Sequence, residues 1–223
     1  MKRPVVLIVG TVDTKSDEIG FMRDQVQAAG GQALIMDVGV LAKGRVIPDI
    51  ANNDVAAAAG LTLQQVMDSG DENSAMALMA QGASRLTAQL QATGRMDGLL
   101  VLGGTMGTDL ALDVASSLPL GVPKVVLSTV AFSPLLPPER MPPDLMMVLW
   151  AGGLYGLNSL CQSALAQAAG AVVGACRVAR VPRFVRPVVG MTSLGSSCLK
   201  YMVQLQGELD RRGFDLAVFH TTG

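Results

Sequence analysis

The feature that most constrains the fold is an uninterrupted apolar run that ends at a glycine and is followed by a helical pattern. Residues 4–9 (PVVLIV) form such a run and stop at Gly10. A continuous β-branched run of this length is typical of a strand buried on both faces of a parallel sheet. Residues 98–102 (GLLVL) repeat the pattern ahead of Gly103 and Gly104. The sequence therefore predicts a parallel sheet with helices on both faces.

Strand and helix patterns alternate along the first 179 residues. Strands are predicted for residues 4–9, 33–38, 98–102, 124–130 and 145–150, and helices for residues 17–29, 52–59, 71–93, about 108–117 and about 155–173. This alternation predicts an α/β fold with a doubly wound, mostly parallel Rossmann-like sheet. Residues 39–54 have no steady period, and we expect a long excursion of the kind that is either functional or disordered.

A second, smaller segment follows residue 179. Residues 180–187 (RVPRFVRP) have a proline near each end and three arginines, which is typical of a linker. The pattern beyond it is a strand at 188–191, a helix at 196–212 and a strand at 215–220. Two strands and one helix cannot bury both faces of a sheet. We therefore interpret residues 188–223 as the first βαβ unit of a truncated second domain.

Composition argues against several classes of function. The chain has 17 Lys and Arg against 18 Asp and Glu, a net charge of −1, so it offers no basic face for nucleic acid. Cys161, Cys176 and Cys198 lack CxxC spacing and His220 is the single histidine, which argues against a disulfide framework, a zinc cluster or a Ser-His-Asp triad. We expect a reducing, cytoplasmic setting, assign no metal site and no catalytic residue, and leave enzyme activity open.

Residues 145–176 carry no charged side chain, a length that raises the question of a membrane span. Asn158, Gln162 and Ser163 interrupt this stretch, so we interpret it as a buried strand, a turn and an uncharged helix, with no membrane partner. Hydrophobic residues make up 50% of the chain and charged residues 16%, which indicates that some apolar surface is covered by self-association. We expect a homodimer or higher oligomer formed through the helix at 155–173.

The strongest candidate binding motif is the loop GGTMGT, with Gly103, Gly104, Thr105, Gly107 and Thr108, between a predicted strand and a predicted helix. Its glycines let backbone amides approach an anion, its hydroxyls add donors, and a helix N-terminus adds partial positive charge. The loop therefore predicts a phosphate site, although it matches neither G-x-G-x-x-G nor G-x-x-x-x-G-K-[ST]. The alternative is a tight turn with a threonine N-cap.

A second loop, with Gly10, Thr11, Asp13, Thr14 and Lys15, follows the first predicted strand. Lys15 would neutralise phosphate, and Asp13 would hold a ribose or a magnesium ion. An Asp or Thr N-cap beside a solvated lysine is the alternative. Because open α/β sheets bind ligands at the carboxyl ends of their strands, the two loops predict one shared crevice.

Three further polar residues stand at ends of predicted strands. Ser128 and Thr129 would add hydroxyls to the same crevice, and Asp37 would meet a ribose hydroxyl, as acids at this location do in dinucleotide sites. Strand-end capping for the first two and a plain turn role for Asp37 are the alternatives.

Several separated stretches together resemble a known family. They are GTVDTKSDE (10–18), DVGV (37–40) with VIPDI (46–50), DGLLVLGGTMGT (97–108), GVPKVVLSTVA (121–131) and YGLNSLCQSALAQAAGAVVGA (155–175). In this order they resemble the ATP-binding family typified by the tomato mosaic virus resistance protein. The resemblance implies a Rossmann-like domain that binds ATP, a second α/β domain beginning near Pro187, and self-association. Met106 replaces a glycine of the family loop, and would strain it if that position needed a positive φ.

The sequence and the resemblance together predict that residues 1–179 bind a nucleotide, ATP, with Mg²⁺ only as its companion. Glycine-rich loops at the sheet's C-terminal edge would hold the phosphate. Two alternatives stay open. One is a hydrolase or transferase that acts on a small phosphorylated or carboxylated metabolite between two α/β domains, and the other is a non-enzymatic, oligomeric interaction module.

Overall fold

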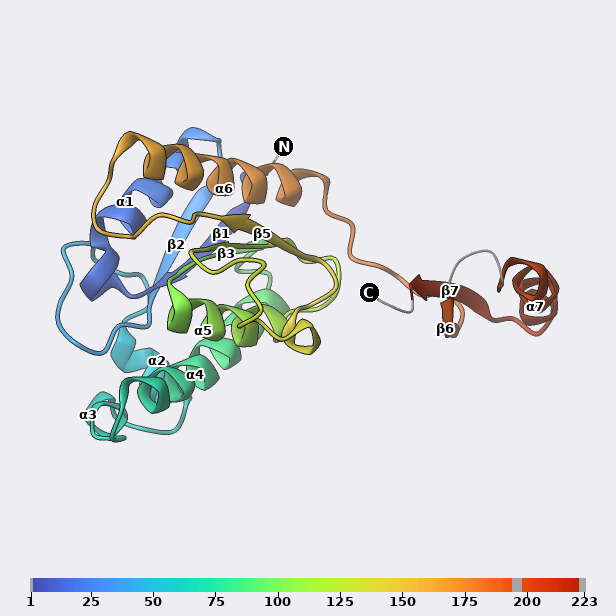
Figure 1. Ribbon diagram of the computed structural model, residues 1–223, viewed down its shortest axis with the longest axis horizontal. Helices are drawn as coiled ribbons and strands as arrows, with labels where there is room; N and C mark the ends of the chain where they lie inside the picture. Colours follow the sequence, from blue (N-terminus) through green and yellow to red (C-terminus); the bar gives the residue numbers. More distant parts are fainter. Residues whose placement is uncertain (1, 194–197, 221–223) are drawn as a thin grey trace. The chain divides into compact units, whose positions relative to one another are not determined.

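The computed structural model describes residues 2–193 and 198–220 and divides the chain into two compact units, Met1–Val181 and Pro182–Gly223 (Figure 1). The first unit contains a five-stranded sheet. Its strands are β1 (Val5–Gly10), β2 (Gln32–Asp37), β3 (Gly98–Gly103), β4 (Lys124–Ser128) and β5 (Leu145–Leu149). All neighbours pair in parallel, in the order β2-β1-β3-β4-β5. The predicted parallel α/β sheet is confirmed.

Helices cover both faces of this sheet. They are α1 (Val12–Ala28), α2 (Asn52–Ala58), α3 (Leu63–Met67), α4 (Glu72–Ala92), α5 (Thr105–Ser116) and α6 (Ser159–Val178), with a short 3₁₀ helix η1 (Pro138–Arg140). In Figure 1, α1 and α6 lie on one face, and α2, α4 and α5 lie on the other. Every residue of β3 and β4 is buried, as the continuous apolar runs predict for strands covered on both sides.

Three helices begin at different residues from those predicted, and their N-terminal caps explain why. The carboxylate of Asp37 accepts a hydrogen bond from the Val12 amide at 3.0 Å, so α1 starts five residues earlier than expected. Gly104 is the N-cap of α5, which places Thr105 inside the helix. The side chain of Asn158 accepts from the Cys161 amide at 2.9 Å and fixes the start of α6. The short α3 was not predicted.

α6 differs from the predicted helix at 155–173: it starts and ends later and includes Arg177. Within the described residues it is the one helix long and apolar enough, by length and composition, to cross a membrane. One side of it is nevertheless part of the core, through Cys161, Leu165, Ala168, Ala169, Val172 and Val173. Self-association through the rest of its surface stays a prediction.

The second unit has the strand–helix–strand order that the sequence predicts. Its elements are β6 (Val188–Ser193), α7 (Leu199–Arg211) and β7 (Asp215–His220), with β6 and β7 paired in parallel. Arg186, just before β6, forms ion pairs with Asp210 at the end of α7, at 2.8 Å, and with Asp215 at the start of β7, at 2.6 Å. The first residues of the helix predicted at 196–212, and the last three of the chain, lie outside the described residues.

A fully buried lysine stands at the start of β4. The Nζ of Lys124 donates to the Asp144 carboxylate at 2.6 Å, to the Pro119 carbonyl at 2.9 Å and to the Val122 carbonyl at 3.1 Å. These bonds link the turn before β4 to the start of β5. A buried charge is tolerated when it is paired and hydrogen-bonded in this way.

We predict that Lys124→Met lowers the free energy of unfolding by about 2–4 kcal/mol, because it removes the cation that pairs with the Asp144 carboxylate and one hydrogen bond to each of two carbonyls. Chemical denaturation measures the change. Lys2→Met is the control: the ion pair of Lys2 with Asp97 spans 3.5 Å at a side chain that is 71% exposed, so we expect less than about 1 kcal/mol. Equal effects of the two substitutions would contradict this account.

Candidate functional site

The two glycine-containing loops predicted to share a crevice do lie together. β1 and β3 are neighbours in the sheet, but the chain leaves β1 toward β2 and leaves β3 toward β4 on the other side. Connections that diverge in this way open a crevice at the carboxyl ends of the two strands. A cavity of about 150 Å³ lies there.

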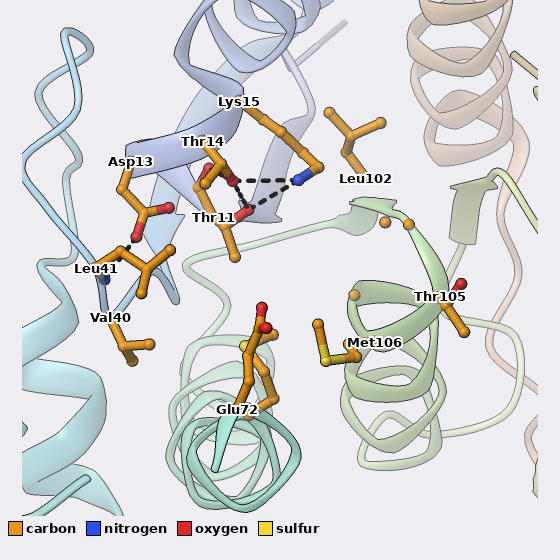
Figure 2. Close-up of a pocket in the computed structure, with 14 residues that line it drawn as sticks. Thr11, Asp13, Thr14, Lys15, Val40, Leu41, Glu72, Leu102, Thr105 and Met106 are labelled. Carbon is orange, nitrogen blue, oxygen red and sulfur yellow. Dashed lines mark hydrogen bonds between the residues drawn. The ribbon is translucent and has the colours of Figure 1, made fainter. Parts of the chain in front are cut away.

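Four segments far apart in the sequence line this cavity (Figure 2). They are the start of α1, the loop after β2, the start of α4, and the β3–α5 turn. The lining residues are Thr11, Asp13, Thr14, Lys15, Val40, Leu41, Glu72, Met76, Leu102, Gly103, Gly104, Thr105, Met106 and Gly107.

On the α1 side, a lysine and two hydroxyls form one cluster. The Thr11 and Thr14 hydroxyls are 2.8 Å apart, and the Lys15 Nζ lies 3.1 Å from the Thr14 hydroxyl and 3.4 Å from that of Thr11 (Figure 2). α1 departs from helical geometry at Lys15, with φ −131° and ψ 32°. The cluster gives this wall one positive charge and two groups that can donate.

On the α5 side, backbone amides form the wall. The first bond within α5 runs from the Thr108 amide to the Gly104 carbonyl at 2.8 Å. The amides of Thr105, Met106 and Gly107 precede it, and amides at this position in a helix have no partner within the helix. Together with the helix dipole they attract anions.

Gly103 is required for the tightness of this turn. A Cβ added there would lie 2.4 Å from the carbonyl carbon of Gly107 and 2.5 Å from the Thr108 amide nitrogen. Gly107, in contrast, has room: an added Cβ would meet the Leu102 carbonyl oxygen at an ordinary 3.6 Å. The fold therefore requires glycine at position 103, whereas it has space for a Cβ at position 107.

Met106 is not strained. It lies in the first turn of α5, and the one non-glycine residue with a positive φ in the described part of the chain is Phe132. The positive φ that would have made methionine costly is absent at this position. Its side chain packs against the core and forms part of the cavity wall.

Two carboxylates face the same cavity. Asp13 accepts a hydrogen bond from the Leu41 amide at 2.8 Å through Oδ2, whereas its Oδ1 is buried without a hydrogen-bond partner. Figure 2 shows the Glu72 carboxylate directed from the start of α4 into the cavity. The cavity thus offers anion-binding groups on α1 and α5 and acceptors for a cation or a hydroxyl on Asp13 and Glu72.

Thr108, Ser128 and Thr129, predicted to bind the ligand, are not among the lining residues. The hydroxyls of Thr108 and Ser128 are fully buried and 2.7 Å apart, and that of Thr108 also donates to the Gly104 carbonyl at 2.7 Å. The Thr129 amide donates to the Gly103 carbonyl at 3.2 Å. Ser128 and Thr129 join the end of β4 to α5 and β3, as in the strand-end capping alternative. Thr108 lies inside α5, whose N-cap is Gly104 and not the threonine of the alternative.

Asp37 and Gly10 also lie outside the lining. Asp37 is 6% exposed and accepts from the amides of Val12 at 3.0 Å and Gly39 at 2.8 Å. Burial raises the pKa of Asp37, against the lowering effect of these two hydrogen bonds. Gly10 gives space to Ile19, whose Cδ1 would lie 2.9 Å from an added Cβ. Both residues shape the turn between β1 and α1.

The prediction from sequence missed six lining residues: Val40, Leu41, Glu72, Met76, Leu102 and Met106. In a doubly wound fold each helix runs back against the strands, so its first turn lies at the edge where ligands bind. Glu72 lies in the first turn of the helix predicted at 71–93, and this position in the sequence could have indicated that it lies at the ligand-binding edge. Val40 and Leu41 belong to the long excursion, which side chains of α1 hold in place, as in the 2.8 Å bond from the Arg45 amide to Ser16 Oγ.

A parallel sheet in the order β2-β1-β3-β4-β5 with a cavity at its switch point defines a doubly wound α/β protein of the flavodoxin-like type. Residues 4–180 match the family described as "Uncharacterised protein family (UPF0261) N-terminal domain". The chain belongs to this family.

Its relatives are about twice as long or longer. A UPF0261 protein of Brucella suis is 58% identical over 220 residues, which cover 99% of this chain and 53% of the relative. A UPF0261 protein of Clostridium tetani is 29% identical over 222 residues, 98% of this chain and 54% of the relative. The ToMV resistance protein Tm-1(GCR237) of Solanum lycopersicum is 26% identical over 243 residues, which cover 99% of this chain and 32% of the relative. The chain thus spans about half the length of these bacterial relatives, and the predicted relation to the tomato protein is confirmed as a distant one.

Asp37 leads to a prediction on pH. Because its pKa is raised in the folded protein from an ordinary value of 3.8, its contribution to stability is fully present below that value and is lost as the pH rises through the folded pKa. Asparagine keeps an acceptor for both amides and has no such titration. The free energy of unfolding of Asp37→Asn should therefore rise, relative to that of the original protein, from about pH 4 to pH 7. A difference that is constant or falls over this range, measured by urea denaturation, would contradict the role of burial.

Proposed function

We propose that the first unit binds a phosphorylated ligand in the cavity between β1 and β3, and that this ligand is a nucleotide, with ATP as the first candidate. The observation that supports the proposal is that Lys15 and the first-turn amides of α5 line the same cavity, on different walls. A cationic side chain and backbone amide donors are groups that commonly bind phosphate oxygens in proteins. The family resemblance to ATP-binding proteins supplies the choice of ATP.

The size of the cavity sets how much of a nucleotide it encloses. At about 150 Å³ it is smaller than the roughly 300–1,000 Å³ of most sites for whole cofactors. It has room for the phosphate end, which would lie between α1 and the first turn of α5. The sugar and base would extend beyond these walls.

A magnesium ion would accompany the phosphates. In residues 2–193 and 198–220, no group of three His, Cys, Asp or Glu side chains is placed to hold a metal ion. The buried and unpartnered Oδ1 of Asp13 and the carboxylate of Glu72 nevertheless suit a cation whose other ligands are phosphate oxygens. The ion would then bind with the nucleotide and not before it.

A hydrolase or transferase is the second candidate, and Glu72 is the observation that favours it. The Glu72 carboxylate is directed into the proposed phosphate site, which is the position that a general base would need. If this role is correct, Glu72→Gln retains the binding of ATP without magnesium and loses the release of phosphate from ATP.

The binding proposal predicts that Gly107→Val weakens ATP binding at least about tenfold, because the added side chain occupies the space where phosphate meets the amides. The free energy of unfolding should not fall, since glycine within a helix costs more than valine. Isothermal titration calorimetry measures the first effect and thermal unfolding the second.

Gly170→Val is the matched control. Gly170 lies in α6, and a Cβ there would meet no heavy atom within 4 Å. ATP affinity should be unchanged in this variant. Undiminished ATP binding by a folded Gly107→Val protein would remove the β3–α5 turn from the proposal.

A further inference from the structure

A second cavity adjoins the proposed phosphate site. It has a volume of about 170 Å³ and lies between α4, α5 and the proline-rich segment that follows β4. Met76, Thr105 and Met106 line both cavities. The two spaces therefore adjoin at these three residues, two of which are methionines with flexible side chains.

The walls of the second cavity combine polar and apolar surface in nearly equal shares. Its remaining lining residues are Asn73, Ala77, Ala80, Asp109, Leu110, Asp113, Leu135 and Leu136. Two small residues on α4, Ala77 and Ala80, leave space opposite the leucines of the proline-rich segment. Such a site takes a flat ring whose edge carries several hydrogen-bonding atoms, and Asn73 offers both a donor and an acceptor to that edge.

The charges of the two cavities differ. None of the described residues that line the second cavity is a lysine or an arginine. Its two aspartates are both bound to Arg140, with 2.7 Å from the guanidinium to Asp113 and a second ion pair to Asp109. The first cavity offers phosphate the Lys15 ammonium and the first-turn amides of α5, beside the carboxylates of Asp13 and Glu72, whereas the second offers it no cationic side chain among its described lining residues.

We infer that the second cavity holds the base of the nucleotide whose phosphates occupy the first. This inference rests on the proposed function and adds the orientation of the ligand: the chain of phosphate, sugar and base passes over Met106 from α1 toward the α4–α5 groove. The two volumes together reach the lower limit of sites for whole cofactors, about 300 Å³. Methionine sulfur in contact with a ring adds a favourable interaction.

The test compares ATP with inorganic tripolyphosphate, which lacks sugar and base, by calorimetry on the same protein. We expect ATP to bind at least about tenfold more tightly than tripolyphosphate. Ala77→Phe fills the second cavity from an exposed position of α4. It should remove most of this preference and leave the affinity for tripolyphosphate unchanged.

Gln81→Phe is the matched control, because Gln81 is exposed one helical turn further along α4 and does not line the cavity. It should keep the preference for ATP. Thermal unfolding checks that Ala77→Phe is folded, and Ala77→Leu replaces it if it is not. Equal affinities for ATP and tripolyphosphate, or a preference that survives filling of the cavity, would overturn this inference and leave the phosphate site in place. Failure of both ligands to bind would overturn both proposals.

Discussion

The parallel pairing of β1 with β3 is the constraint on which the rest of the site depends. The pairing aligns Val6 with Gly98 and Val9 with Val101, so the two strands end at the same edge of the sheet. Each is followed by a turn built on a glycine that a Cβ would crowd, Gly10 against Ile19 and Gly103 against α5. Two helix starts are thereby brought to one cavity, one with a lysine and the other with amides that lack partners in their helix.

Polar residues at this edge divide into two groups by burial. Asp37, Thr108 and Ser128 are buried and bonded to backbone or to each other, which satisfies groups that would otherwise be costly. Thr11, Thr14 and Lys15 bond mainly among themselves and face the cavity. The first group holds the turns in place, and the second is available to a ligand. Proximity to a strand end therefore does not by itself make a residue a binding residue.

Much of the fold could be predicted from sequence, because the signals are local: continuous apolar runs mark buried strands, and glycines mark turns. The helix starts were less predictable. α1 begins at Val12 because Asp37, on the next strand, caps it, and a cap supplied from another element leaves no trace in the helix itself. The shared cavity followed from topology, since both loops end strands of one sheet. Glu72 was missed although its place at the start of the helix predicted at 71–93 indicated this edge, whereas Leu41 could not be assigned, because its position depends on how the loop after β2 packs.

The central claim is that the amides of Thr105, Met106 and Gly107 and the ammonium of Lys15 bind one anion together. Titration of the ¹⁵N-labelled chain with ATP, followed by amide NMR, tests it most directly. The account predicts that these three amide signals shift together and saturate at the same ATP concentration, and that Lys15→Met weakens this response. Saturable shifts confined to another part of the chain, or a response that does not depend on Lys15, would contradict it.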